Sequence, residues 1–277
     1  MARLTRKMWV GIGAATLVGA SVAGSASAQA PAHKSHGAGQ APPAGRGAVG
    51  TAAEGGEAYL TDGGPRDTRI RFYRDIALIR GHLLIGSELI ALDMWDEALP
   101  HFLHPTEELY GLLEKYIKAH KIRPFRLELQ ALAQAVKARR KGAYEQALKV
   151  VDQRLKGALD TARRFMTPGF AGYTARTAAE MLKVALSEYE GSLEDGRVAK
   201  PVEYQDSRGF VWEAERMVEE AAPELARTDA VSLAKIRAAL AQLKTAWPAP
   251  MPPAAPVIEP GKLSALISDI ELHASRY

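Results

Sequence analysis

The residue types best suited to chemistry gather in one short stretch of the sequence, residues 81–110. Three of the seven histidines and several carboxylates lie there, and the candidate metal ligands are His82, Glu88, His101, His104 and Glu108. Imidazole and carboxylate groups together can bind zinc, iron, copper or manganese. We therefore predict a site for a divalent or trivalent transition metal, with iron or copper favoured and zinc possible.

The spacing of the first two candidates does not place them on one face of a straight helix. His82 and Glu88 are six residues apart, so at 3.6 residues per turn they point about 120° away from each other. Gly86 lies between them and offers a place for a bend. Without such a bend, tertiary folding must bring the ligands together.

Prolines complicate the geometry of the other two histidines. His101 and His104 would share a face of a helix, because residues three apart are neighbours there. Pro100 and Pro105 interrupt this segment, and we expect the helix to break at both. Pro105 suits the first turn of a following helix, which would make His104 its N-cap. Glu108 would then lie in the first turn, where the helix dipole favours acids.

Ordinary structural roles can also explain His82 and Glu88. His82 can be a core histidine with a hydrogen-bonded partner, and Glu88 can pair with a buried arginine. In that case the stretch is a docking groove, and the protein is a metal-free helical interaction module of the cell envelope. Both hypotheses stay open, and elemental analysis of the purified protein distinguishes them.

A second, weaker group of oxygen ligands lies in the second half of the chain. These residues resemble hard ligands for ferric iron, and they are Tyr189, Glu190, Glu203, Tyr204 and Asp206. They can equally be surface residues.

The composition excludes several classes of site. The sequence has no cysteine, which rules out thiolate metal sites and thiol catalysis. It also lacks a nucleophile elbow, a phosphate loop, an HExxH motif and a dinucleotide fingerprint. No enzyme class is indicated, and any metal must be held by nitrogen and oxygen ligands.

The first 28 residues are typical of a secretory signal peptide. A basic start precedes an apolar run, and Ala26-Ser27-Ala28 forms a small-x-small cleavage site. This segment carries three of the basic residues and no acidic ones, so removing it lowers the net charge from +4 to +1. We expect a periplasmic protein with no membrane span after cleavage, and the charge gives no support for nucleic-acid binding.

Helical periodicity dominates the chain after a lead-in. Residues 29–67 are rich in Ala, Gly and Pro, and we expect them to be disordered. From residue 68 we predict an all-α fold, with eight helices near 68–95, 105–120, 125–140, 144–165, 171–193, 207–225, 230–247 and 261–275.

A weak repeat at an offset of 100 residues pairs Ser87-Glu88 with Ser187-Glu188. It predicts two related four-helix bundles from an internal duplication, residues 68–166 and 167–277.

The predicted repeat allows His82, His101 and His104 to be compared with the residues 100 positions later. Their counterparts in the second half are Leu182, Pro201 and Tyr204. The histidines therefore occur in one half only, which packing alone does not require.

The organisation resembles the imelysin-like family of exported, all-helical bacterial proteins. The resemblance covers about residues 69–277 and depends on the double bundle and on the segments Ala246-Trp247-Pro248 and Ile270-Glu271-Leu272. It implies a role in iron uptake, an envelope transport protein as partner, and a His-x-x-Glu metal site. The family's Gly-x-His-x-x-Glu motif is absent, and its nearest counterpart here is Gly81-His82 followed by Glu88.

The cleavage site gives a direct test of export. We predict that the mature protein begins at Gln29, which mass spectrometry of a periplasmic fraction measures. A mature chain that starts elsewhere would contradict the predicted cleavage after Ala28.

Overall fold

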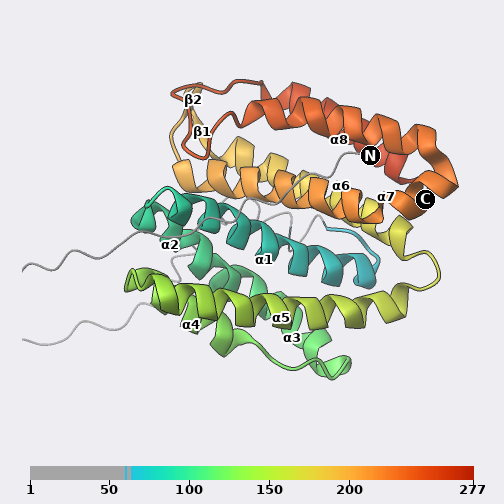
Figure 1. The fold of residues 1–277 in the computed structure, drawn as a ribbon. Coiled ribbons are helices and arrows are strands. Elements are labelled where there is room, and N and C mark those ends of the chain that lie inside the picture. Colours follow the sequence, from blue (N-terminus) through green and yellow to red (C-terminus); the bar gives the residue numbers. More distant parts are fainter. Residues whose placement is uncertain (1–59, 61–63) are drawn as a thin grey trace, which may run out of the picture. The chain divides into compact units, whose positions relative to one another are not determined.

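Helices make up nearly all the regular structure in the computed structural model, which describes Leu60 and residues 64–277 (Figure 1). In chain order they are α1 (Thr68–Ala91), α2 (Trp95–His104), the π-helix η2 (Pro105–Leu109), α3 (Tyr110–Ala119), α4 (Arg126–Lys137), α5 (Lys141–Met166), α6 (Phe170–Gly191), α7 (Pro201–Leu243), the 3-10 helix η3 (Lys244–Ala246) and α8 (Pro260–Ala274). The predicted all-α fold is confirmed. The predicted signal peptide, and the lead-in apart from residues 60 and 64–67, lie outside the described residues.

One small hairpin interrupts the helices between α6 and α7. Its strands, β1 (Leu193–Glu194) and β2 (Arg197–Val198), pair antiparallel. Asp195 and Gly196 join them with φ values of 49° and 72°, as a two-residue hairpin turn requires. These are the only strands in the described part of the chain, and two residues are too short to show an alternating sequence pattern.

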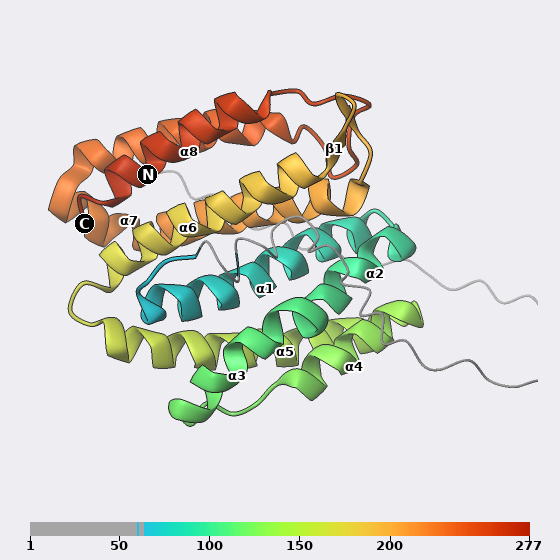
Figure 2. The same ribbon diagram turned by 180° about the vertical axis from the view of Figure 1, so that it is seen from behind.

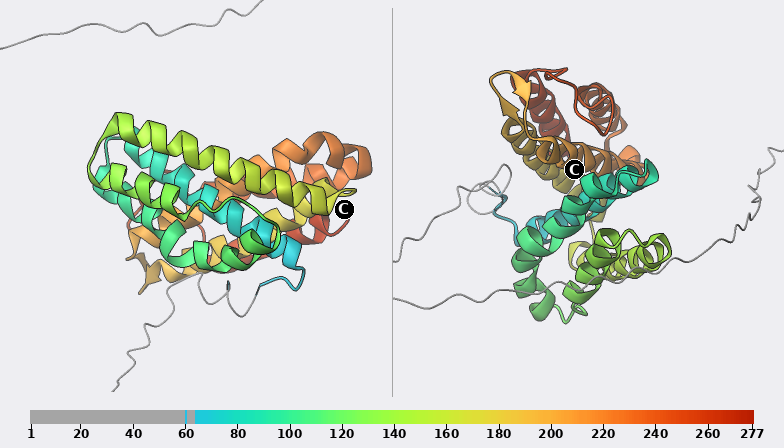
Figure 3. Two further views of the ribbon diagram at one scale, coloured as in Figure 1. Left: turned by 90° about the horizontal axis from the view of Figure 1, so that it is seen from below. Right: turned by 90° about the vertical axis from the view of Figure 1, so that its left-hand side faces the viewer.

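The helix α1 lies at the centre of the fold. Asp67 caps its start by accepting a hydrogen bond from the backbone N–H of Arg69. The helix is buried on nearly all sides, as its lack of a polar face predicts. It packs against α6 and α7 on one side and against α2 and α5 on the other, and Figure 2 and the right-hand view of Figure 3 show it between these groups.

The long helix α7 begins earlier than the sequence pattern suggests. The predicted start was near residue 207, but the helix begins at Pro201, whose missing N–H suits the first turn. Residues 205 and 206 therefore lie inside the helix. The chain leaves helical geometry at Asp229 (φ −153°, ψ 90°), whose carboxylate accepts from the backbone N–H groups of Val231 and Ser232. This cap divides α7 into two helical segments, close to the predicted division.

The predicted breaks at Pro100 and Pro105 are wrong. α2 runs through Pro100 and continues into η2 and α3. Pro105 cannot donate to the carbonyl of His101, and the chain takes a wider π turn over Pro105–Leu109. His104 has right-handed helical geometry and makes no capping hydrogen bond with its side chain. It is therefore not an N-cap, and it shares a helix face with His101.

Two glycines bring α1 and α7 into backbone contact. A Cβ atom at Gly209 would lie 2.4 Å from the carbonyl oxygen of Gly81, and one at Gly81 would lie 2.6 Å from the ring of Phe210. Both distances are shorter than atoms tolerate, so only glycine allows this approach. Gly81 precedes His82, and Gly209 lies one turn after Asp206, so the contact fixes the distance between those two side chains.

The two halves of the chain share one core because α1 packs on α6 and α7. The domain boundary near residue 167 and the common origin of the two halves stay predictions. In the described part of the chain, no helix combines the length and the apolar character needed to cross a membrane.

The contact between α1 and α7 predicts a stability difference. Gly209→Ala should lower the free energy of unfolding by about 1–3 kcal/mol, because the added methyl group has no room. Gly157→Ala, at an exposed position inside α5, should raise it by roughly 0.5–1 kcal/mol, because alanine favours helix. Urea denaturation of both variants measures this, and a Gly209→Ala protein as stable as wild type would contradict the close approach.

Candidate metal centre

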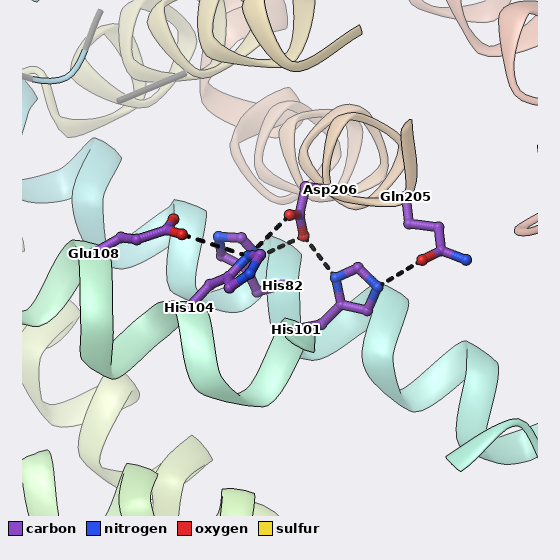
Figure 4. A network of polar contacts seen from close by, with 6 residues as sticks. All are labelled: His82, His101, His104, Glu108, Gln205 and Asp206. Atoms are coloured by element: carbon purple, nitrogen blue, oxygen red, sulfur yellow. Dashed lines mark hydrogen bonds and ion pairs between the residues drawn. The ribbon is translucent and has the colours of Figure 1, made fainter. Parts of the chain in front are cut away.

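Four helical elements bring the polar cluster together. α1 carries His82, α2 carries His101 and His104, η2 carries Glu108, and α7 carries Asp206. Figure 4 shows the three imidazole rings directed toward the Asp206 carboxylate. Continuous helix through Pro100 places the two histidines of α2 one turn apart on one face. The three histidines therefore converge through tertiary folding, and the carboxylate on which they converge comes from α7.

Asp206 is the centre of the cluster. Its Oδ1 lies 2.6 Å from Nδ1 of His82 and 2.7 Å from Nδ1 of His101. Its Oδ2 lies 3.1 Å from Nδ1 of His104. An ionised carboxylate only accepts hydrogen bonds, so each ring donates its Nδ1–H to it. Asp206, His82 and His101 are no more than 3% exposed, so this arrangement is inside the protein.

A glutamine holds the far side of the His101 ring. The Nε2 atom of His101 lies 2.9 Å from Oε1 of Gln205, and the amide nitrogen of Gln205 donates to Sδ of Met251 at 3.5 Å. Because the Gln205 amide nitrogen points to Met251, its oxygen Oε1 is the atom that accepts from Nε2–H of His101. With an acceptor at each of its two nitrogens, the His101 ring has a fixed orientation, as rings held by outer partners have in metal-binding histidines.

One side of the cluster opens to solvent through an acidic pocket. The His104 side chain is 22% exposed, and its Nδ1 lies 3.8 Å from Oε1 of Glu108. The pocket has a volume of about 280 Å³, and its lining residues are Pro100, His104, Glu108, Glu188, Val202, Glu203 and Asp206. No lysine or arginine is among them, so the entrance favours cations.

The buried carboxylate sets the protonation of the cluster. Burial alone would raise the pKa of Asp206, but the imidazoles of His82 and His101 hold it well below its usual range. Burial lowers the pKa of His82 despite its contact with Asp206. Burial also opposes the charged form of His104, but its hydrogen bond to Asp206 and the charges of Asp206, Glu108 and Glu188 outweigh this and raise its pKa to about 9.

Glu88, the remaining predicted ligand, has a different partner. Both of its carboxylate oxygens accept from the Arg208 guanidinium, at 2.7 and 3.0 Å. Arg208 also donates to the backbone carbonyl of Trp247 at 2.7 Å. The arginine pairing that the sequence analysis left open is thus the arrangement found, and Glu88 ties α1 to α7 outside the histidine cluster.

The second group of oxygen ligands does not form a separate site. The hydroxyl groups of Tyr189 and Tyr204 donate to the backbone carbonyls of Ile258 and Ala249. Glu203 lines the acidic pocket, Asp206 belongs to the histidine cluster, and Glu190 is exposed. Asp206 was predicted to belong to this second group, but its hydrogen bonds place it with the three histidines.

The donor atoms can hold a metal ion in two combinations. His82, His101 and Asp206 offer one ligand atom each, and these atoms lie within 4.8 Å of one another. The same holds for His82, His104 and Glu108. Imidazole nitrogen and carboxylate oxygen suit ferrous iron and other divalent transition metals. The residues therefore fit such an ion, and the low pKa of Asp206 keeps its charge available.

A sequence comparison links the chain to iron uptake. A sequence model of the iron permease-associated 4-helix bundle domain matches residues 171–276. This segment contains α7, which supplies Gln205 and Asp206. The match links the C-terminal half to helical bundles of iron uptake, and the resemblance to the imelysin-like family stays a prediction. No curated protein and no solved structure matches the chain.

The raised pKa of His104 predicts a pH dependence in the metal-free protein. A group whose pKa rises from 6.5 to about 9 on folding adds stability that is complete below pH 6.5 and is lost as the pH rises through about 9. The free energy of unfolding of wild type should therefore fall over this range relative to His104→Gln. Chemical denaturation across the pH series measures the difference, and parallel curves for the two proteins would contradict it.

Proposed function

We propose that this protein binds one iron ion in the periplasm and serves iron uptake through an envelope transport protein. The ligands come from the imidazoles of His82, His101 and His104 and the carboxylates of Asp206 and Glu108, which form two combinations of three around the shared His82. One observation carries this proposal: three imidazoles from two helices converge on a single buried, ionised carboxylate.

A purely structural role does not account for this cluster well. Burying imidazole and carboxylate groups is costly unless every one of them has a partner. One histidine would be enough to pair with Asp206, yet three are directed at it. At the positions that the predicted duplication makes equivalent, the chain has Leu182, Pro201 and Tyr204, so on that prediction a related bundle packs without these histidines.

The hydrogen bonds of the cluster orient its donor atoms before a cation binds. An ion that replaces the Nδ1–H proton of His101 leaves the Nε2–H bond to Gln205 in place, so the ring keeps its orientation. His104 is mostly protonated at neutral pH because of its raised pKa, so its positive charge balances Asp206 until a cation displaces the proton. Binding is then an exchange of protons for metal around a fixed carboxylate.

Iron is the favoured ion for two reasons. The matched domain family is iron permease-associated, and its match covers the helix that supplies Asp206. The donors are imidazole and carboxylate groups, without the thiolates that favour zinc or cuprous copper. The acidic pocket beside His104 gives a cation a route to the ligands.

The proposal also places the protein in a transport process. The predicted signal peptide supports a periplasmic location, where an iron-binding protein can deliver its ion to a permease. A metal-free interaction module remains the competing hypothesis, and it requires that the cluster bind no ion.

Titration calorimetry under anaerobic conditions tests metal binding. Wild type should bind one ferrous ion per chain, and His82→Ala should abolish this, because His82 belongs to both ligand combinations. His120→Ala is the matched control, because the His120 ring packs on Phe165, outside the cluster.

Three outcomes of this titration show whether the protein binds ferrous iron and where. Loss of binding in His82→Ala with normal binding in His120→Ala supports the site. Equal binding by all three proteins places the ion elsewhere. Wild-type binding weaker than about 1 mM would contradict the proposal and favour the interaction module.

A further inference from the structure

The two ligand combinations share His82 but differ in their access to solvent. His82, His101 and Asp206 form an inner set in which all three residues are buried. His82, His104 and Glu108 form an outer set, and the side chains of His104 and Glu108 are 22% and 30% exposed. In Figure 4 the Glu108 side of the cluster lies opposite to the His101 and Gln205 side.

Each set has its own supporting contacts. The inner set is held by Gln205, which lies at Nε2 of His101, and by the Phe210 ring, whose centroid lies 4.9 Å from that of His82. The outer set borders the acidic pocket, to which Glu188 and Glu203 also contribute. The π turn of η2 begins directly after His104 and contains Glu108, and it directs both residues toward this pocket. π turns of this kind are frequent at functional sites.

On the basis of the proposed function, we propose that the cation occupies two positions in succession, first the outer set at the pocket and then the inner set around Asp206. His82 is the ligand common to both positions. The ion enters with part of its water shell, because the outer residues are open to solvent. It loses more water as His101 and Asp206 replace His104 and Glu108.

One ion rather than two fits the charge of the cluster. Asp206 and Glu108 together supply two negative charges, and neutral imidazoles supply none. A single divalent ion is balanced by these carboxylates. A second ion only a few ångströms away would meet strong repulsion inside the protein, where charges are poorly screened.

The outer set is suited to capturing the ion and the inner set to retaining it. An exposed set that keeps water can exchange its ion quickly with solvent. A buried set with fixed rings should hold the ion and release it slowly. A delivery protein needs both properties, and the shared His82 lets the ion pass between them without leaving the protein.

Stopped-flow mixing with cobalt(II) alone tests the two positions, because its visible absorbance changes when water ligands are replaced. Wild type should show a fast phase whose rate rises with cobalt concentration, followed by a slower phase whose rate does not. Glu108→Gln should lose the fast phase, with capture slowed by roughly tenfold or more. His101→Gln should keep the fast phase and lose the slower one.

Controls separate this inference from the proposed function. Circular dichroism checks that both variants fold, and Glu108→Gln, at a half-buried position, remains informative if His101→Gln does not fold. Identical single-phase kinetics in wild type and Glu108→Gln would overturn the two positions while leaving the metal site intact. Binding of two cobalt ions per chain would overturn the proposal that one ion occupies the two sets in succession. No cobalt or iron binding by wild type would remove the proposed function itself.

Discussion

The contact between Asp206 and three imidazoles is the interaction on which the rest of the site depends. The carboxylate is buried and charged, so it needs donors on both of its oxygens. Those donors come from α1 and α2, more than 100 residues earlier in the chain. The fold must therefore bring α7 against α1 and keep α2 helical beside them.

Several features of the α1–α7 interface serve this requirement. Gly81 and Gly209 let the two backbones approach next to His82 and one turn from Asp206. Glu88 and Arg208 form a bidentate ion pair two turns further along α1. Arg208 also binds the carbonyl of Trp247, which attaches the end of η3 to the same interface. These contacts fix the position of α7 against α1, and with it the distance between Asp206 and His82.

Local sequence patterns predict the helices but not every partner of the site. Periodicity, prolines and glycines placed most helices well, because these signals act within a few residues. Pro100 is an exception, since α2 continues through it and keeps His101 and His104 on one face. Asp206 could not be grouped with the histidines from the sequence, because these partners lie more than 100 residues away and only tertiary packing brings them together. Glu88 lies on the same helix as His82, yet only the tertiary structure reveals its pairing with Arg208.

Anomalous diffraction at the iron absorption edge, on crystals of the protein loaded with ferrous iron, locates the bound ion. We expect one strong peak within coordination distance of His82 and of carboxylate oxygens from Asp206 or Glu108. A peak elsewhere, or none in crystals whose solution contains excess iron, would contradict the claim that this cluster exists to bind the metal.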